Sequence, residues 1–423
     1  MLQVIYIKEN RSKTIEGLVK KNYKTAVEDV DNILRLDEER KKLQAAMDNA
    51  LAESNKLAKE IGELMKAGKK AEAEEKKTAT AELKSKSKEY GEKLEALENE
   101  LNQTLVKLPN LPHDSVPPGV TAEDNEVVFE QGAPPSLHEN ALPHWELIKK
   151  YDIIDFELGT KITGAGFPVY KGKGAKLQRA LINFFLDQAS EAGYFEVQPP
   201  ILINKDSGFG TGQLPDKDGQ MYFAQADELY LIPTAEVPIT NIYRDVILKK
   251  EELPIKNAGY TPCFRREAGS WGAHVRGLNR LHQFDKVEIV QIVDPVTSYQ
   301  ALDQMVEHVK GLLTKLELPF RILRLCGGDM SFSSALTFDF EVFSGAQKRW
   351  LEVSSVSNFE TFQSNRLKCR FKNEEGKNQL VHTLNGSAMA LPRIVAAILE
   401  NNQTEKGINL PKVLHPYLGF DKI

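Results

Sequence analysis

The segment 28–108 places the strongest limit on what this chain can fold into, because it contains no proline and only three glycines. Apolar residues recur in it at alternating steps of three and four, first over 33–64 and again over 83–108. This spacing is the heptad pattern of a coiled coil. Gly68 interrupts the pattern and supplies a turn. The segment is therefore predicted to form two helices that pack as an antiparallel hairpin.

Each of these helices should be about 55 Å long, at roughly 1.5 Å per residue, so we expect the hairpin to project into solvent. Its charge is uneven. Residues 56–88 carry ten lysines against six glutamates, whereas the rest of the segment holds six basic and thirteen acidic residues. A solvated helix surface explains such a run, and so does a basic tip that binds nucleic-acid phosphates. Charge alone leaves both readings open.

The composition of the whole chain narrows the functional classes. The chain has 423 residues and a net charge of −5, so a nucleic-acid partner would have to be met by local basic patches. Cys263, Cys326 and Cys369 are scattered without a CxxC pair. This spacing argues against a zinc site or a disulfide framework and fits a reducing cytoplasm. No apolar run approaches the ~18 residues of a membrane-spanning helix.

The sequence divides into an N-terminal domain at 1–108, a proline-rich linker at 109–135 and a larger domain at 136–423. In the larger domain, β-rich runs alternate with amphipathic helices, which indicates an α+β fold. The helices are predicted at 177–192, 301–318 and 388–401, the last of these as the final helix, and a strand is predicted at 335–343. The segment 197–202, with Pro199 and Pro200, suits a sheet edge.

Two groups of residues carry the chemistry. The run Thr261-Pro262-Cys263-Phe264-Arg265-Arg266-Glu267, followed by His282-Gln283-Phe284-Asp285-Lys286-Val287-Glu288, indicates two strands joined by a loop. Glu267, two residues after Arg265, is expected on the same strand face. The second group is Glu352-Val353-Ser354-Ser355-Val356-Ser357-Asn358-Phe359, with Asn385-Gly386-Ser387 and Arg393 downstream. A planar, permanently charged guanidinium suits developing charge on a phosphate. Carboxylate and hydroxyl oxygens suit Mg²⁺.

With these motifs the chain resembles the bacterial-type seryl-tRNA synthetases, which are class II aminoacyl-tRNA synthetases. The resemblance covers essentially the whole chain. It includes the helical hairpin, the segments Gly210-Thr211-Gly212-Gln213-Leu214-Pro215 and Thr234-Ala235-Glu236-Val237-Pro238, and Thr383-Leu384-Asn385-Gly386-Ser387. It implies a class II antiparallel sheet with flanking helices. It also implies a homodimer formed through the helix at 177–192 and Pro199-Pro200.

The resemblance assigns roles residue by residue. It implies catalytic roles for Arg265 at the α-phosphate and Arg393 at the γ-phosphate, with Glu267 and Phe284 against the adenine. The implied ATP-binding set is Arg265, Arg266, Glu267, Arg280, Phe284, Glu352, Val353, Ser354, Ser355 and Arg393. The implied serine-binding set is Thr234, Ala235, Glu236, Glu288, Asn385 and Ser387. Glu352 and Ser355 are the implied Mg²⁺ ligands. Ala388 and Pro392 stand where this family commonly has glycine.

The implied reaction is the ATP-dependent joining of L-serine to the 3′ end of tRNA(Ser), and of tRNA(Sec) where that tRNA exists. Taken singly, each residue also has an ordinary explanation: a surface arginine, a core phenylalanine or a strand-end acid. A related ligase that charges a carrier protein is one alternative, and the long basic-tipped hairpin argues against it. A non-catalytic coiled-coil RNA-binding protein is another, and the set of Arg265, Glu288, Glu352 and Arg393 argues against that.

Overall fold

The computed structural model describes residues 1–267 and 275–423. The chain forms two compact units, Met1–Pro109 and Asn110–Ile423. Within the described residues, no helix is both long and apolar enough to cross a membrane. The residues 268–274, between the two strands of the Arg265 and Glu288 motif, lie outside the described part of the chain.

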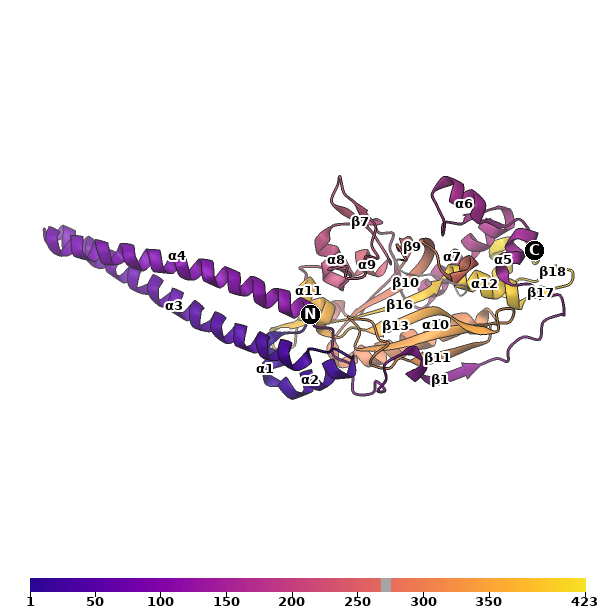
Figure 1. The fold of residues 1–423 in the computed structure, drawn as a ribbon, viewed down its shortest axis with the longest axis horizontal. Helices are drawn as coiled ribbons and strands as arrows, with labels where there is room; N and C mark the ends of the chain where they lie inside the picture. The colour runs from indigo at the N-terminus through magenta and orange to yellow at the C-terminus, as the bar shows by residue number, and fades with distance from the viewer. Residues whose placement is uncertain (268–274) are drawn as a thin grey trace. The chain divides into compact units, whose positions relative to one another are not determined.

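The first unit is a helical hairpin with two short helices at its N-terminus (Figure 1). Its elements are α1 (Val4–Glu9), α2 (Arg11–Lys20), α3 (Ala26–Lys66) and α4 (Lys70–Lys107). The two long helices have 41 and 38 residues. Gly68 lies in the turn between them with φ of +75°, a conformation that favours glycine. The predicted antiparallel hairpin and its turn are confirmed.

The interior of the hairpin is more polar than the heptad pattern predicted. On α3 the seam contains fully buried Ile33 and Leu36. On α4 one buried position recurs every seven residues, and it changes from large to small residues along the helix. Those residues are Leu101, Leu94, Ser87, Thr80 and Ala73. The apolar pattern missed the last three because serine, threonine and alanine carry little hydrophobic signal.

The second unit is built on an eight-stranded sheet with the order β1-β11-β12-β13-β16-β10-β9-β4. In that order the strands are Glu126–Gln131, Phe320–Arg324, Leu336–Ser344, Arg349–Asn358, His382–Ala390, Gln283–Val293, Ile255–Phe264 and Phe195–Glu196. All neighbours are antiparallel except β4 and β9, which pair in parallel at one edge. The predicted antiparallel sheet is confirmed, with one parallel pair added.

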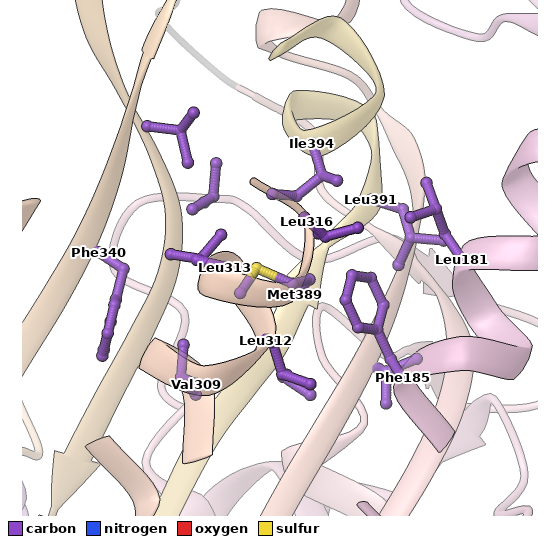
Figure 2. Close-up of a cluster of buried hydrophobic side chains, with 14 of the residues drawn as sticks. Leu181, Phe185, Val309, Leu312, Leu313, Leu316, Phe340, Met389, Leu391 and Ile394 are labelled. Carbon is purple, nitrogen blue, oxygen red and sulfur yellow. The ribbon is translucent and has the colours of Figure 1, made fainter. Parts of the chain in front are cut away.

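Three helices share one hydrophobic core against this sheet. They are α7 (Gly172–Glu191), α10 (Ser298–Lys315) and α12 (Leu391–Asn401). Figure 2 shows side chains from all three meeting at the sheet, among them Phe185, Leu312 and Ile394 beside Phe340 and Met389. On β10, Val287 and Ile289 belong to this core. Successive strand side chains alternate in direction, so Lys286 and Glu288 point to the opposite face.

Smaller elements complete the second unit. The helices are α5 (His144–Lys150), α6 (Phe156–Ile162), α8 (Lys205–Thr211), α9 (Glu236–Asn241), α11 (Thr361–Leu367) and α13 (His415–Leu418). The short strands are β2 (Ile154–Asp155), β3 (Val169–Tyr170), β5 (Leu202–Ile203), β6 (Phe223–Ala224), β7 (Leu229–Leu231), β8 (Ile247–Leu248), β14 (Arg370–Lys372), β15 (Asn378–Leu380), β17 (Gln403–Thr404) and β18 (Gly407–Ile408). Single 3₁₀ turns include η1 (Ala122–Asp124), η2 (Lys250–Glu252), η4 (Gly277–Asn279), η5 (Pro295–Thr297) and η6 (Lys412–Leu414).

The sequence misplaced one boundary at the end of the chain. The helix predicted at 388–401 begins only at Leu391, because 388–390 continue β16, in which Met389 and Ala390 pair with Val287 and Lys286 of β10. Nor is it the final helix, because α13 follows it. Pro392 lies in the first turn of α12, where its missing N–H breaks no helical hydrogen bond.

The proline-rich segment 109–135 contains ordered elements as well as connecting chain. It holds η1 and β1, and β1 pairs with β11 at the edge of the large sheet. At its start, the Asn110 amide donates to the carbonyls of Ser333 and Phe359 at 2.9 and 2.8 Å. From Asn110 onward the segment is therefore fixed within the second unit.

Candidate active site

One cavity of about 250 Å³ collects many of the predicted ATP-binding residues. Of that set, Arg265, Glu267, Arg280, Phe284, Glu352, Val353, Ser354 and Arg393 line it, together with Ser387 from the serine-binding set. Phe284 comes from β10, Glu352, Val353 and Ser354 from β13, Ser387 from β16 and Arg393 from α12, whereas Arg265, Glu267 and Arg280 lie in the chain between β9 and β10. Residues up to 128 positions apart are thus brought to one wall by the antiparallel pairing of these strands. Arg266 and Ser355 do not line this cavity.

Arg265 lies just beyond the end of β9. Its backbone N–H donates to the His282 carbonyl at 2.9 Å, which continues the pairing across the hairpin. The Arg265 guanidinium carbon lies 5.3 Å from the centre of the Phe284 ring, within cation–π range. The predicted arginine and aromatic are therefore held against each other.

Glu267 reaches the cavity, but not by the strand alternation that the sequence predicted. Strand β9 ends at Phe264, and Glu267 has a φ of +49°, so strand alternation does not orient it. Its carboxylate nevertheless lines the cavity and forms an ion pair with Arg280. Two residues predicted to contact ATP therefore also contact each other.

Arg393 spans two parts of the cavity wall. Its Nε donates to the Asn279 carbonyl at 3.1 Å, and its Nη1 donates to the Glu352 carbonyl at 2.7 Å. The Glu352 carboxylate lies 3.5 Å from the same guanidinium. The candidate phosphate-binding arginine and the candidate metal ligand are therefore neighbours.

A β-bulge brings the two candidate metal ligands to one face of the sheet. Glu352 and Ser355 are three residues apart, so they would point in opposite directions on a regular strand. Glu341 pairs with Glu352 and Phe340 with Ser354, which leaves Val353 as an extra residue. After this bulge, Ser355 pairs with Asp339 and lies on the same face as Glu352.

Asp339 adds a third oxygen side chain at this place. Burial and the charge of Glu352 raise the pKa of its carboxyl well above the usual value. Its Oδ1 is buried without a hydrogen-bond partner. Within residues 1–267 and 275–423, no three His, Cys, Asp or Glu side chains converge as a complete metal cluster. Glu352, Ser355 and Asp339 nonetheless form a set of oxygen donors that fits a hard divalent cation.

The predicted serine-binding residues form a buried cluster next to the cavity. Glu288 is fully buried and pairs with Lys286 at 2.7 Å. The Thr234 hydroxyl donates to its Oε2 at 3.0 Å, and the Asn385 amide donates to its Oε1 at 2.7 Å. Lys286 also lines the cavity, so it connects the two groups of residues.

Glu236, at the start of α9, is the second buried acid of this region. Burial and the nearby charge of Glu288 raise its pKa to about 7. Its Oε1 accepts a 2.7 Å hydrogen bond from Gln363, which also donates to the Thr211 carbonyl at 3.2 Å. Thr234 supports the start of α9 by accepting from the Glu236 N–H at 3.2 Å, and Ala235 is fully buried beneath it.

A second bulge places Ser387 beside Glu288. Val287 pairs with Met389 and Glu288 with Ser387, which leaves Ala388 as the extra residue of β16. Ala388 is buried and is not among the residues with positive φ, so the site does not require glycine there. The departure at Ala388 is therefore compatible with the local backbone.

Sequence reasoning missed Lys286, Asn279 and Gln363. Lys286 had a usable signal, because it lies between Phe284 and Glu288 at the two-residue period of a strand. Asn279 and Gln363 had none, since their contacts join segments distant in the sequence, as with Gln363 and Glu236, which are 127 residues apart.

Two family models match this chain. A model of the seryl-tRNA synthetase N-terminal domain matches residues 1–112, and a model of the class II tRNA synthetase core domain (G, H, P, S and T) matches residues 222–402. The antiparallel sheet and the cavity described above therefore belong to a class II aminoacyl-tRNA synthetase.

Individual relatives narrow the class. The serine–tRNA ligase of Salinibacter ruber is 51% identical over 93% of this chain and 92% of its own length. That of Chlorobaculum parvum is 44% identical over the full length of both chains. The crystal structure of seryl-tRNA synthetase from Pyrococcus horikoshii complexed with ATP superposes with a TM-score of 0.94. That structure is 32% identical and covers 100% of this chain and 99% of its own. This chain belongs to the seryl-tRNA synthetase family.

Proposed function

We propose that this protein is a serine–tRNA ligase that activates L-serine with ATP and transfers it to tRNA(Ser). The main observation behind the proposal is that Lys286 and Ser387 line the cavity and also adjoin the buried cluster around Glu288. On one side of these two residues lie Arg265, Glu352 and Arg393, which suit a triphosphate, and on the other lies the buried Glu288 cluster, which suits a small polar amino acid. Family membership supports the same reaction.

In the first step, a carboxylate oxygen of serine attacks the α-phosphorus of ATP. A new O–P bond forms, the bond to the bridging oxygen breaks, and pyrophosphate leaves. Arg265 would stabilise the charge that grows on the α-phosphate, and Arg393 would hold the γ-phosphate. Phe284 offers the adenine a stacking surface, and Glu267 a hydrogen-bond acceptor for its amino group. Arg280, which also lines the cavity, completes the proposed phosphate contacts.

Mg²⁺ would be held by Glu352 and Ser355, with Asp339 close behind, and the ATP phosphates would supply further oxygen ligands. When bound, it would neutralise charge on the phosphates. The donor set of this face fits that ion. Val353 and Ser354 would fix the bulge that turns Glu352 and Ser355 to one side.

Serine recognition would use both buried acids. Glu236, with Thr234 and Ala235 at the start of α9, would receive the ammonium group. Glu288, with Ser387 and Asn385, would receive the hydroxyl. A site built to hydrogen-bond a hydroxyl discriminates strongly against an analogue that lacks it. Alanine should therefore be a poor substrate.

In the second step, the 3′-terminal ribose hydroxyl of the tRNA attacks the carbonyl carbon of seryl-adenylate. An ester bond forms, the hydroxyl proton is lost and AMP leaves. The basic residues of 56–88 would bind the RNA phosphates. By family resemblance, the proposal extends to tRNA(Sec) where that tRNA exists, and to work in the cytoplasm, where the buried free thiols of Cys263, Cys326 and Cys369 would stay reduced.

We also propose a homodimer formed by α7 and β4. Phe195 of this edge strand is 72% exposed, and Ile182, Leu186 and Val197 line the adjoining surface groove. An apolar edge of this kind usually marks an interface. Sedimentation should give a dimer mass for the wild type and a monomer mass for Phe195→Asp. A monomeric wild type would refute this part of the proposal.

Pyrophosphate exchange tests the activation step. With each standard amino acid in turn, only serine should support strong exchange of label from pyrophosphate into ATP. Arg265→Ala should lower serine-dependent exchange by about 10²–10³ in rate, since it removes one preorganised charge from the transition state. An Arg265→Ala variant that stays within a few-fold of wild type would remove Arg265 from the reaction.

A further inference from the structure

A buried polar cluster lies behind one wall of the cavity, outside the residues assigned to the reaction. His144 and Glu400 are both fully buried. The Glu400 Oε1 lies 2.6 Å from His144 Nδ1, and it accepts from the His144 backbone N–H and from Gln347 Nε2 at 2.9 Å each. The Ser344 hydroxyl donates to the other oxygen. Burial raises the pKa of Glu400, but the bonds from His144 and Ser344 lower it more, so the net shift is downward.

The second ring nitrogen of His144 holds a segment of the cavity wall. His144 Nε2 accepts a hydrogen bond from the backbone N–H of Leu278, at 2.9 Å between the two nitrogens. Because Nδ1–H donates to the Glu400 carboxylate, these two bonds assign a neutral ring with its proton on Nδ1. Gly277 lies against the same ring with φ of +68°, and any side chain there would place its Cβ only 2.3 Å from Nε2. Gly277 and Leu278 therefore contact the imidazole directly.

This segment reaches the ATP-binding residues. Leu278, Asn279 and Arg280 all line the cavity. The Asn279 amide donates to Gln347 Oε1 at 3.0 Å, and its carbonyl accepts from Arg393 at 3.1 Å. A change in the position of 277–280 would therefore also move Arg280 and Arg393.

Helix α12 holds the segment at two points. Arg393 and Glu400 are both in α12, seven residues and so about 10.5 Å apart on one helix face. Arg393 contacts the segment through Asn279, and Glu400 contacts it through His144.

We propose that His144 and Glu400 are positioning residues for ATP: they fix the segment 277–280, and thereby orient Arg280 and Arg393 toward the triphosphate. This inference rests on the proposed function. A displacement of about 1 Å in a preorganised site can reduce rate by up to 10²-fold. Neither side chain needs to touch the nucleotide, because His144 acts through its hydrogen bond with Leu278, and Glu400 acts through His144 and through Gln347, which bonds Asn279.

Two amide substitutions at His144 test the roles of its two ring nitrogens separately. In His144→Asn, the amide can still donate to Glu400 but is too short to accept from Leu278, whose N–H is then buried without a partner. In His144→Gln, the amide oxygen can reach the position of Nε2 and restore that bond. We expect His144→Asn to raise both the KM for ATP in pyrophosphate exchange and the calorimetric Kd for ATP by roughly tenfold, the usual effect of an unsatisfied buried donor. The KM for serine should stay within about twofold, and His144→Gln should recover most of the loss.

His382→Asn is the matched control, because His382 bonds Ser298 at 2.8 Å and does not line the cavity. It should leave both KM values unchanged. Equal rises in the KM for ATP and for serine in His144→Asn, or wild-type affinity for ATP, would overturn the inference.

A second variant covers the case in which His144→Asn does not fold. Gln347→Leu removes the bond to Asn279 from the other side, and an unchanged KM for ATP in that variant would overturn the inference equally. A wild type that binds ATP but shows no serine-dependent exchange would instead refute the proposed function, and the calorimetric comparison would still stand.

Discussion

At the scale of single residues, the two buried acids of the proposed serine site differ in how their charge is balanced. Glu288 is paired with Lys286 at 2.7 Å and receives two further hydrogen bonds. Glu236 receives a hydrogen bond from the neutral amide of Gln363. Its pKa of about 7 therefore reflects burial first and the neighbouring charge of Glu288 second. Glu236 therefore changes its charge near neutral pH.

This difference predicts a pH dependence for serine binding. The pKa of Glu236 is raised, so the carboxyl gains a proton and loses its charge as the pH falls through 7. Serine's ammonium group then loses its partner. The KM for serine should rise about tenfold between pH 8 and pH 6, as expected for one group titrating midway. The KM for ATP, measured in the same exchange assay, should change much less.

Glu236→Gln serves as the control for this titration. It should give a high KM for serine that stays flat over the same pH range, because the titrating group is gone. A wild-type profile with no change between pH 6 and pH 8 would show that Glu236 does not control serine binding.

How far the sequence predicts the site is clear from particular residues. The motifs, through the family resemblance, indicate Arg265, Phe284, Glu352 and Arg393, and the structure brings all four to one cavity. The pairing of His144 with Glu400 has no such signal, because it joins residues 256 positions apart with no periodic pattern. The ion pair of Glu267 with Arg280 depends on a backbone φ that no residue pattern specifies.

At the scale of elements, a β-bulge explains how two residues of β13 that are predicted to share one site come to the same face. A regular alternation would have put Glu352 and Ser355 on opposite faces, and one extra residue at Val353 reverses that. The predicted helix start at 388 was wrong. Residues 388–390 have apolar side chains that suit either element, and the pairing of Met389 and Ala390 with β10 decides in favour of the strand.

The hairpin seam offers a matched test at this scale. Leu36 is fully buried in α3, whereas Leu51 of the same helix is 42% exposed. Leu36→Ala should destabilise the hairpin by about 2–5 kcal/mol, since buried leucine truncations lose transfer energy and leave a cavity. Leu51→Ala should change stability by less than about 0.5 kcal/mol. Hydrogen exchange of α3 and α4 amides in the full chain measures both, and equal protection in the two variants would contradict the assigned seam.

At the scale of the whole molecule, the proposed binding of RNA by the hairpin depends on exposed lysines that are not engaged in ion pairs within the hairpin. Lys76 forms an ion pair with Glu60 of the other helix, and Lys69 and Lys77 pair with Glu72 and Glu74. Replacing these would also alter contacts within the hairpin. The exposed residues Lys70, Lys84 and Lys86 make a cleaner test set.

We expect replacement of Lys70, Lys84 and Lys86 by alanine to weaken tRNA binding and flatten its salt dependence. The slope of log K against log salt should fall by about 0.7–0.9 for each phosphate that is no longer neutralised. Serine-dependent pyrophosphate exchange should be unaffected. The control replaces the exposed Lys42, Lys93 and Lys107, which lie in the acidic part of the hairpin; of these, Lys93 forms an ion pair with Glu89 of the same helix. Equal slopes for the two triple variants would mean that the basic stretch is only a solvated helix surface.

The buried positions of α4 change from leucine to serine, threonine and alanine along the helix, and this change should make the stiffness of the hairpin uneven along its length. Interlocked leucines resist shear between two helices, whereas Ser87, Thr80 and Ala73 leave little to interlock. Thr80 also bonds back to the Lys76 carbonyl at 2.8 Å, an interaction that bends helices. We therefore expect α3 and α4 to be rigid where the leucines pack and more flexible toward the turn at Gly68. Distances between spin labels placed on α3 and α4 should then vary more widely toward Gly68. This flexibility would let the basic residues of 56–88 follow RNA as it moves.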